Sequence, residues 1–264
     1  MRKFLFLMAF IICSFSFSAT LTQSWLVSTT SGASQGVGAG IVLMDAGSAL
    51  RGLDFSTTES KVFLASGTNI YVINSNDGTT TGNGYNQNGQ VDVTGASGGT
   101  RVINKVKVAD DGAIYACNLQ TAIATGALKI YRWANSASSI SVAVNTTISG
   151  LPVARYGDSL GVIGSGVNTE IYVSGSGQTR ILKFTTTDGV NFTLATTIAV
   201  TANYGGTDIA PVAVNGNLWV SGSGVLTYKI NQSGTVLETI SGTVAATGWP
   251  VSMIAKQKMV ILTF

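Results

Sequence analysis

Short segments rich in β-branched and aromatic residues, with polar residues interspersed, recur along most of this chain. No segment has apolar residues at the 3.6-residue spacing that would predict an amphipathic helix. Polar turn sequences such as Asp188-Gly189 separate the apolar segments. The pattern therefore predicts an all-β protein that is built from many short strands joined by tight turns.

A short polar phrase recurs four times over residues 51–208. Its copies begin at Arg51, Arg101, Arg155 and Gly205, and each ends three residues later on an aspartate or an asparagine. The copies lie 50, 54 and 50 residues apart. Such a period, in a chain rich in glycine, serine and threonine, is typical of a radial or stacked array of small β-sheets.

Each repeat contains the same order of predicted strands. One strand follows the polar phrase, a second is centred on an aromatic residue, and a third and a weaker fourth complete the unit. The central aromatics are Phe63, Tyr115, Tyr172 and Trp219. Residues 91–93 are the predicted fourth strand of the first unit. Four strands in about 50 residues correspond to one blade of a β-propeller. A parallel β-helix is the alternative, but its coils are shorter and the turns favour antiparallel hairpins.

The repeats set the expected domain limits. We expect a propeller-like domain over residues 47–264, with four complete blades followed by a partial fifth blade. The blades are placed at about 47–100, 101–150, 151–204, 205–245 and, for the partial one, 246–264. Residues 19–46 contain further apolar segments that could supply the missing strands and close the ring. Alternatively, the sequence is a fragment of a larger propeller, and both alternatives remain open.

Residues 1–18 have the organisation of a secretory signal peptide. Arg2 and Lys3 precede an apolar run from Phe4 to Cys13, and small residues alternate up to Ser18. The run is too short to span a bilayer, which needs about 20 residues. We therefore expect cleavage after Ser18, no membrane span in the cleaved chain, and a protein that is secreted or held at the cell surface.

Charge and composition narrow the class of function. The chain has 15 Lys and Arg against 12 Asp and Glu, and loss of Arg2 and Lys3 with the signal would leave a net charge of only +1. Because the basic residues form neither a cluster nor a stripe, nucleic-acid binding is not expected. Hydrophobic residues make up 45% of the chain, which argues against disorder.

The residue inventory also restricts catalysis. The chain contains no histidine, so Ser-His and Cys-His nucleophile pairs and histidine-ligated zinc are excluded. Cys117 would be the one cysteine left after signal cleavage, and its neighbours Ala116 and Asn118 provide no positive charge that would lower a thiol pKa. We interpret Cys117 as a small buried apolar residue. With no recognisable catalytic motif, we do not expect an enzyme.

The recurring polar phrase is the one constellation that could carry chemistry. If each copy begins the innermost strand of a blade, its side chains converge around one end of the propeller axis. The candidate site residues are Arg51, Asp54, Arg101, Asn104, Arg155, Asp158 and Asp208. Arginines and aspartates in such a ring could neutralise one another as a structural lattice, because unpaired buried charges are costly.

Other interpretations of the same ring remain open. Asp54, Asn104, Asp158 and Asp208 could coordinate Ca²⁺, which takes about six to eight oxygen ligands, and no other cofactor is expected. The arginines could instead bind part of a glycan or of a surface protein. The enzymatic alternative is a glycoside hydrolase or lyase that uses channel-facing aspartates such as Asp158 and Asp208, although the sequence marks neither as the acid.

Three sequence runs carry a resemblance to a known family. They are DDGAIYACN at 110–118, LKIYRWAN at 128–135 and YGDS at 156–159. These runs resemble the central signature of a secreted, propeller-like bacterial family that is catalogued only as a domain of unknown function. The resemblance covers roughly residues 47–245. It implies a propeller-like fold and a secreted or surface location, and it transfers no activity or catalytic residue. We therefore expect a secreted, non-catalytic binding or structural module at the bacterial surface.

Overall fold

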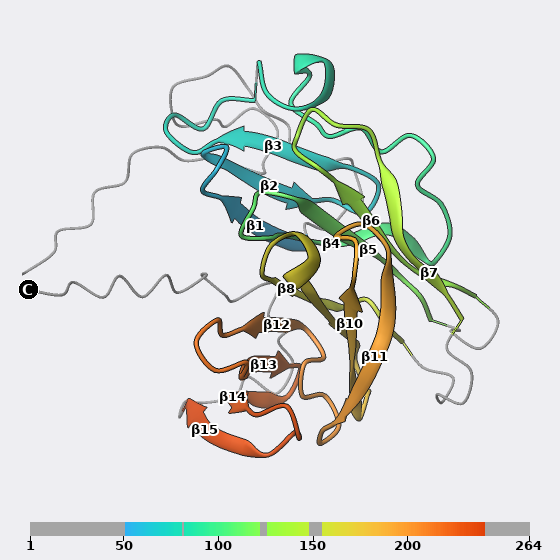
Figure 1. Ribbon diagram of the computed structural model, residues 1–264, viewed down its shortest axis with the longest axis vertical. Coiled ribbons are helices and arrows are strands. Elements are labelled where there is room, and N and C mark those ends of the chain that lie inside the picture. Colours follow the sequence, from blue (N-terminus) through green and yellow to red (C-terminus); the bar gives the residue numbers. More distant parts are fainter. Residues whose placement is uncertain (1–50, 81, 122–125, 148–154, 241–264) are drawn as a thin grey trace, which may run out of the picture.

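The computed structural model describes residues 51–80, 82–121, 126–147 and 155–240. Within these ranges the chain forms four antiparallel sheets that are arranged as the blades of a β-propeller (Figure 1). Helical structure in the described ranges is confined to two short 3₁₀ helices, η1 (Tyr85–Gln87) and η2 (Gly166–Asn168). None of the described helices has the length and apolarity needed to cross a bilayer. The prediction of an all-β propeller is therefore confirmed.

Strands that are consecutive in the chain are neighbours in every sheet. The first blade contains β1 (Gly52–Ser56), β2 (Lys61–Ala65) and β3 (Ile70–Asn74). The second contains β4 (Arg101–Val108), β5 (Ile114–Leu119), β6 (Leu128–Trp133) and β7 (Ser141–Thr146). The third contains β8 (Ser159–Ile163), β9 (Glu170–Ser174), β10 (Arg180–Thr186) and β11 (Phe192–Ala199). The fourth contains β12 (Asp208–Pro211), β13 (Leu218–Gly222), β14 (Val225–Ile230) and β15 (Val236–Ile240).

Within the described residues, the first blade has three strands, not the expected four. Residues 91–93 do not form a strand. The segment before them contacts β3 through an isolated bridge between Gln90 and Tyr71 and through backbone hydrogen bonds from Val72 to Gly89 and from Val91 to Ile70. The Asp92 carboxylate then accepts a hydrogen bond from the Thr94 amide at 3.0 Å. This local turn competes with strand pairing and ends the contact with β3.

The first strand of each blade lies nearest the propeller axis. β1, β4, β8 and β12 lie in the middle of Figure 1, and β1 packs on β4, β4 on β8 and β8 on β12. β1 approaches β4 very closely at Gly52, where an added Cβ atom would lie 2.7 Å from the backbone nitrogen of Val106. A glycine is therefore required for this contact between the innermost strands.

Three hydrophobic cores lie between successive blades. Phe63 belongs to the core between the first and second blades, Tyr115 to the next core, and Tyr172 to the core between the third and fourth blades. Each of these aromatics is at most 1% exposed. Tyr115 packs edge to face on Phe192 of the following blade, with ring centroids 5.7 Å apart. The central aromatics of the first three blades thus join the sheets face to face, as expected from the sequence.

Trp219 of the fourth blade lies in a different environment. Its neighbours Leu218 and Val220 enter the core shared with the third blade, so by strand alternation Trp219 faces the opposite side of the sheet. There its ring is half-buried and lies 5.5 Å from the Lys229 ammonium group. The predicted signal peptide, the ring-closing strands at 19–46 and the partial blade at 246–264 lie outside the described residues.

Candidate functional site

The first two copies of the polar phrase connect neighbouring blades. Asp54 lies within β1, and its carboxylate accepts a hydrogen bond at 2.7 Å from the backbone amide of Val108 in β4. Asn104 lies within β4 and donates through Nδ2 to the Gly157 carbonyl, 2.6 Å away and just before β8. Both side chains are buried. Each therefore binds the innermost segment of the blade that follows its own.

The third copy depends on a glycine at its centre. Gly157 has a φ of +92°, and a Cβ atom there would lie 1.9 Å from the carbonyl oxygen of Asn118. Both the backbone conformation and the lack of space require glycine at this position. The turn brings the Gly157 carbonyl to Asn104 while Arg155 and Asp158 interact with each other across it.

Asp158 is held by two arginines. Arg155 donates from Nε at 2.5 Å and from Nη2 at 2.8 Å, one bond to each carboxylate oxygen, and this pairing raises the pKa of Arg155. Nη1 of Arg51, in the first blade, lies 3.7 Å from Oδ1. The backbone amide of Ser176 donates a further hydrogen bond at 3.1 Å. The buried carboxylate is thus neutralised by cations of its own blade and of the first blade.

Asp208 of the fourth blade pairs with a lysine of the second. Nζ of Lys107 lies 3.3 Å from the Asp208 carboxylate, and the two side chains are only 6% and 1% exposed. Lys105 lies two residues earlier on β4 and is also buried. Burial lowers the pKa of Lys105, and the negative charge of Asp208 opposes this shift.

Neither Lys105 nor Lys107 belongs to the recurring phrase, so sequence reasoning missed both. A signal was nevertheless present in the run Lys105-Val106-Lys107-Val108. Val106 and Val108 enter the core between the first two blades. Strand alternation then directs the two lysines to the other face of β4.

The structure does not bring Asp54, Asn104, Asp158 and Asp208 together as a calcium site. Each side chain has a different bonding partner, and the described residues contain no group of three or more Asp, Glu, Cys or His that could hold a metal ion. The ammonium group of Lys107 also occupies the position beside Asp208. Its positive charge would repel a cation there.

Arg101 lies at the same end of the innermost strands as Arg51. Arg101 begins β4, and two residues later Ile103 bridges to Gly67, just beyond the end of β2. The Arg51 amide in turn donates to the carbonyl of Ala65 at the end of β2. Within the described part of the chain, the guanidinium of Arg101 forms neither an ion pair nor a hydrogen bond.

Cys117 is fully buried close to the same centre. Its Sγ lies 3.5 Å from the Gly157 carbonyl, and burial raises the pKa of the thiol to about 12. A thiol of such high pKa is not a nucleophile near neutral pH. The position agrees with the interpretation of Cys117 as a small core residue.

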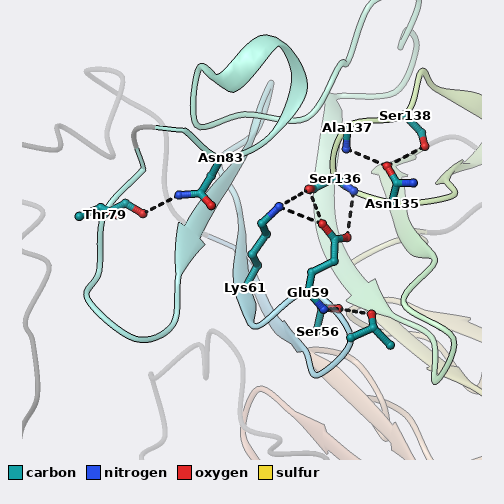
Figure 2. Close-up of polar contacts among 10 residues, drawn as sticks. Ser56, Glu59, Lys61, Thr79, Asn83, Asn135, Ser136, Ala137 and Ser138 are labelled. Carbon is teal, nitrogen blue, oxygen red and sulfur yellow. Dashed lines mark hydrogen bonds and ion pairs between the residues drawn. The ribbon is translucent and has the colours of Figure 1, made fainter.

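A second polar cluster joins the first two blades away from the recurring phrase. Figure 2 shows Glu59, Lys61 and Ser136 pointing toward one another. The Ser136 hydroxyl donates to Glu59 at 2.5 Å, the Ser136 amide donates to Glu59 at 3.0 Å, and Nζ of Lys61 lies 2.8 Å from the hydroxyl. Sequence reasoning missed this cluster because no motif marks residues 77 positions apart.

The geometry of this cluster superficially resembles that of a serine nucleophile beside a lysine base. Lys61, however, also forms an ion pair with Glu59 at 3.0 Å, and the Ser136 hydroxyl donates its hydrogen bond to that carboxylate and not to the lysine. Ser136 is moreover only 1% exposed. The cluster is therefore a latch between blades.

The fold and the buried charges at its axis define a β-propeller domain that is held together centrally by ion pairs and side-chain hydrogen bonds. No family model matches the sequence, and no curated protein matches it. Among solved structures, a DUF4623 family protein from Bacteroides eggerthii is similar to this chain, with a TM-score of 0.58 and 19% identity. The match covers 72% of this chain and 44% of that protein, so this chain spans less than half of its length.

A luciferin-regenerating enzyme also matches, over 71% of this chain and 61% of that protein, with 12% identity and a TM-score of 0.42. The likeness to the DUF4623 family protein shows a shared fold and no function, and the likeness to the enzyme is too weak to carry an argument.

Proposed function

We propose that this protein is a secreted, non-catalytic β-propeller that serves as a binding or structural module at the surface of a bacterium. The features of residues 1–18 support export from the cytoplasm. The runs at 110–118, 128–135 and 156–159, together with the fold shared with the DUF4623 family protein, support membership of a propeller-like family of unknown function. Such a role needs a rigid scaffold and exposed loops, but no catalytic group.

The observation that carries the proposal is the engagement of every aspartate of the recurring phrase by the protein itself. Asp158 is bound by two arginines, Asp208 by Lys107, and Asp54 by a backbone amide. None of the three is more than 4% exposed. A glycosidase needs two carboxyl groups that face a sugar, one to protonate the leaving group and one to attack or activate water. Carboxylates that neutralise buried cations are better suited to holding blades together.

The alternative is a carbohydrate-active propeller enzyme that uses Asp158 and Asp208. Assaying the wild type and Asp158→Asn on a panel of polysaccharides distinguishes the two functions. We expect no turnover by the wild type and a lower melting temperature for Asp158→Asn, since Arg155 and Arg51 lose their anionic partner. Glu238→Gln, which removes an exposed carboxylate, should leave the melting temperature unchanged. Turnover by the wild type that disappears in Asp158→Asn at an unchanged melting temperature would establish the enzyme instead.

Binding requires its own test, for which a glycan array and whole bacterial cells are suitable probes. The proposed module should bind defined glycans or surface proteins without altering them. Calcium chloride in a thermal-shift assay serves as the metal control. We expect no saturable rise in melting temperature, because the carboxylates of Asp54, Asp158 and Asp208 are already bound by other groups of the protein.

A further inference from the structure

Positive charge is concentrated at the propeller axis. The described residues carry 11 basic and 11 acidic side chains, so this part of the protein is neutral as a whole. Five of the bases but only three of the acids belong to the axial group. Its members are Arg51, Arg101, Lys105, Lys107, Arg155, Asp54, Asp158 and Asp208. The axis therefore has an excess of two positive charges, which the rest of the domain balances elsewhere.

The three arginines account for this excess. Lys107 is matched by Asp208, whereas Arg51 and Arg155 share the single carboxylate of Asp158 and Arg101 has no ion pair among the described residues. The pKa of Arg51 is lowered, first by burial and next by the positive charge of Arg101, and only then is it raised by Asp158. The charge of Arg101 therefore acts on Arg51, as expected for two residues at the same end of the neighbouring innermost strands β1 and β4.

Some hydrogen-bond donors at this end of the axis have no partner among the described residues. Arg155 binds both oxygens of Asp158, whereas Arg51 reaches only one oxygen and its Nε–H is buried with no acceptor in the described part of the chain. Arg101 has no polar partner for its side chain within the described ranges. The side chains of Arg51 and Arg155 are nevertheless 28% and 33% exposed, so solvent reaches the group.

From this arrangement we infer that Arg51, Arg101 and Arg155 form a binding site for a single oxyanion group, such as the carboxylate of an acidic sugar or an inorganic sulfate or phosphate. Guanidinium groups bind such anions through paired N–H donors in one plane, as Arg155 already binds Asp158. The inference rests on the proposed binding role and specifies the chemistry that one end of the propeller recognises.

The shape of the charge distribution favours one anionic group over a polyanion. A nucleic acid is bound by basic residues along a stripe that contacts successive phosphates. Here the three arginines lie at one end of the axis, and the fourth copy of the phrase has Gly205 where the others have arginine. The site therefore accommodates a single charged group at the axis.

Calorimetric titration of the purified protein at constant ionic strength tests the inference. The probes are sodium glucuronate, sodium sulfate, sodium phosphate, and glucose as the neutral counterpart of glucuronate. We expect saturable binding of at least one anion and none of glucose. Arg101→Gln should weaken that binding at least tenfold without lowering the melting temperature, because Arg101 has no described partner to lose. Arg132→Gln, which removes an arginine on β6 away from the axis, should bind the anion like the wild type.

The outcomes are distinct. Tighter binding of glucuronate than of sulfate and phosphate would identify an acidic sugar as the ligand, and the reverse order an inorganic anion. Equal weakening in Arg101→Gln and Arg132→Gln, or absence of saturable binding, would overturn the inference. Binding of a single-stranded oligonucleotide without binding of the small anions would overturn it in favour of nucleic acid. If Arg101→Gln leaves glycan or cell binding intact, the anion site fails while the proposed binding module stands.

Discussion

Asp208 and Lys107 are 101 residues apart in the sequence and lie on the innermost strands of the fourth and second blades, yet their side chains meet at 3.3 Å beside the axis. Arg51 and Asp158 make the corresponding contact between the first and third blades at 3.7 Å. Both ion pairs skip a blade. They connect parts of the propeller that share no hydrophobic core, since each core joins successive blades only.

The hydrogen bond from the Val108 amide to the Asp54 carboxylate should stabilise the contact between the first two blades. What matters for this bond is an oxygen acceptor at position 54, and not its negative charge. Asp54→Leu leaves the buried Val108 amide without this acceptor, and we expect a loss of about 1–3 kcal/mol in the free energy of unfolding. Asp54→Asn retains an oxygen acceptor and should cost clearly less. Urea denaturation of both variants measures the difference. Equal losses would show that the charge of Asp54 matters and not its hydrogen bond.

The Glu59 latch should hold the turn after β1 against the second blade. Glu59→Ala removes the acceptor for the amide and hydroxyl of Ser136 and should destabilise the protein by about 1–3 kcal/mol. The Ser136 amide should also exchange its hydrogen faster with solvent. Ser138→Ala removes an exposed hydroxyl of the same loop and serves as the control. Unchanged exchange at Ser136 in Glu59→Ala would contradict the latch.

Burial of Cys117 predicts a loss of stability at alkaline pH. Its folded-state pKa of about 12 lies above the ordinary 9.0, so between these values the unfolded chain releases a proton that the folded protein keeps. The stability that this group contributes is present below about pH 9 and decreases as the pH rises toward 12. Cys117→Ala should therefore lose less stability than the wild type over this range.

Two comparisons check the thiol directly. The lowered pKa of Lys105 acts in the opposite direction and is present in both proteins, so the difference between their pH profiles reports Cys117 together with its interaction with Lys105. In addition, iodoacetamide at pH 8.5 should modify Cys117 only after denaturation. Rapid modification of the folded protein would show that the thiol is accessible.

The blade pattern was predictable because it depends on local signals that repeat. Alternating apolar residues, glycine-containing turns and one central aromatic per unit indicate strands and their order. Phe63, Tyr115 and Tyr172 occupy equivalent places in the three cores for this reason. The prediction of a strand at residues 91–93 was wrong because the turn formed by Asp92 competes with strand pairing. The alternation of apolar and polar residues does not show which of the two forms.

The partners at the axis were less predictable. The recurrence of Asp54, Asn104, Asp158 and Asp208 indicated that they are equivalent in sequence, but their bonds differ from blade to blade. Asp54 binds a backbone amide, Asn104 a carbonyl, Asp158 two arginines and Asp208 a lysine outside the phrase. These differences depend on which residues the neighbouring and opposite blades present, and sequence spacing carries no such information.

A double-mutant cycle on Lys107 and Asp208 tests most directly whether buried ion pairs across the axis hold the blades together. Asp208→Asn leaves Lys107 and the nearby Lys105 without this carboxylate and should lower the free energy of unfolding by about 3–5 kcal/mol. Lys107→Met should cost less, because Lys105 still acts on Asp208. The more exposed pair Lys229 and Glu238 is the control, with a coupling energy below about 1 kcal/mol.

Urea denaturation of the single and double variants gives the coupling energy. We predict that the double variant loses at least about 1.5 kcal/mol less than the sum of the two single losses, and more than the control pair couples. Additive losses, or single variants as stable as the wild type, would contradict the account.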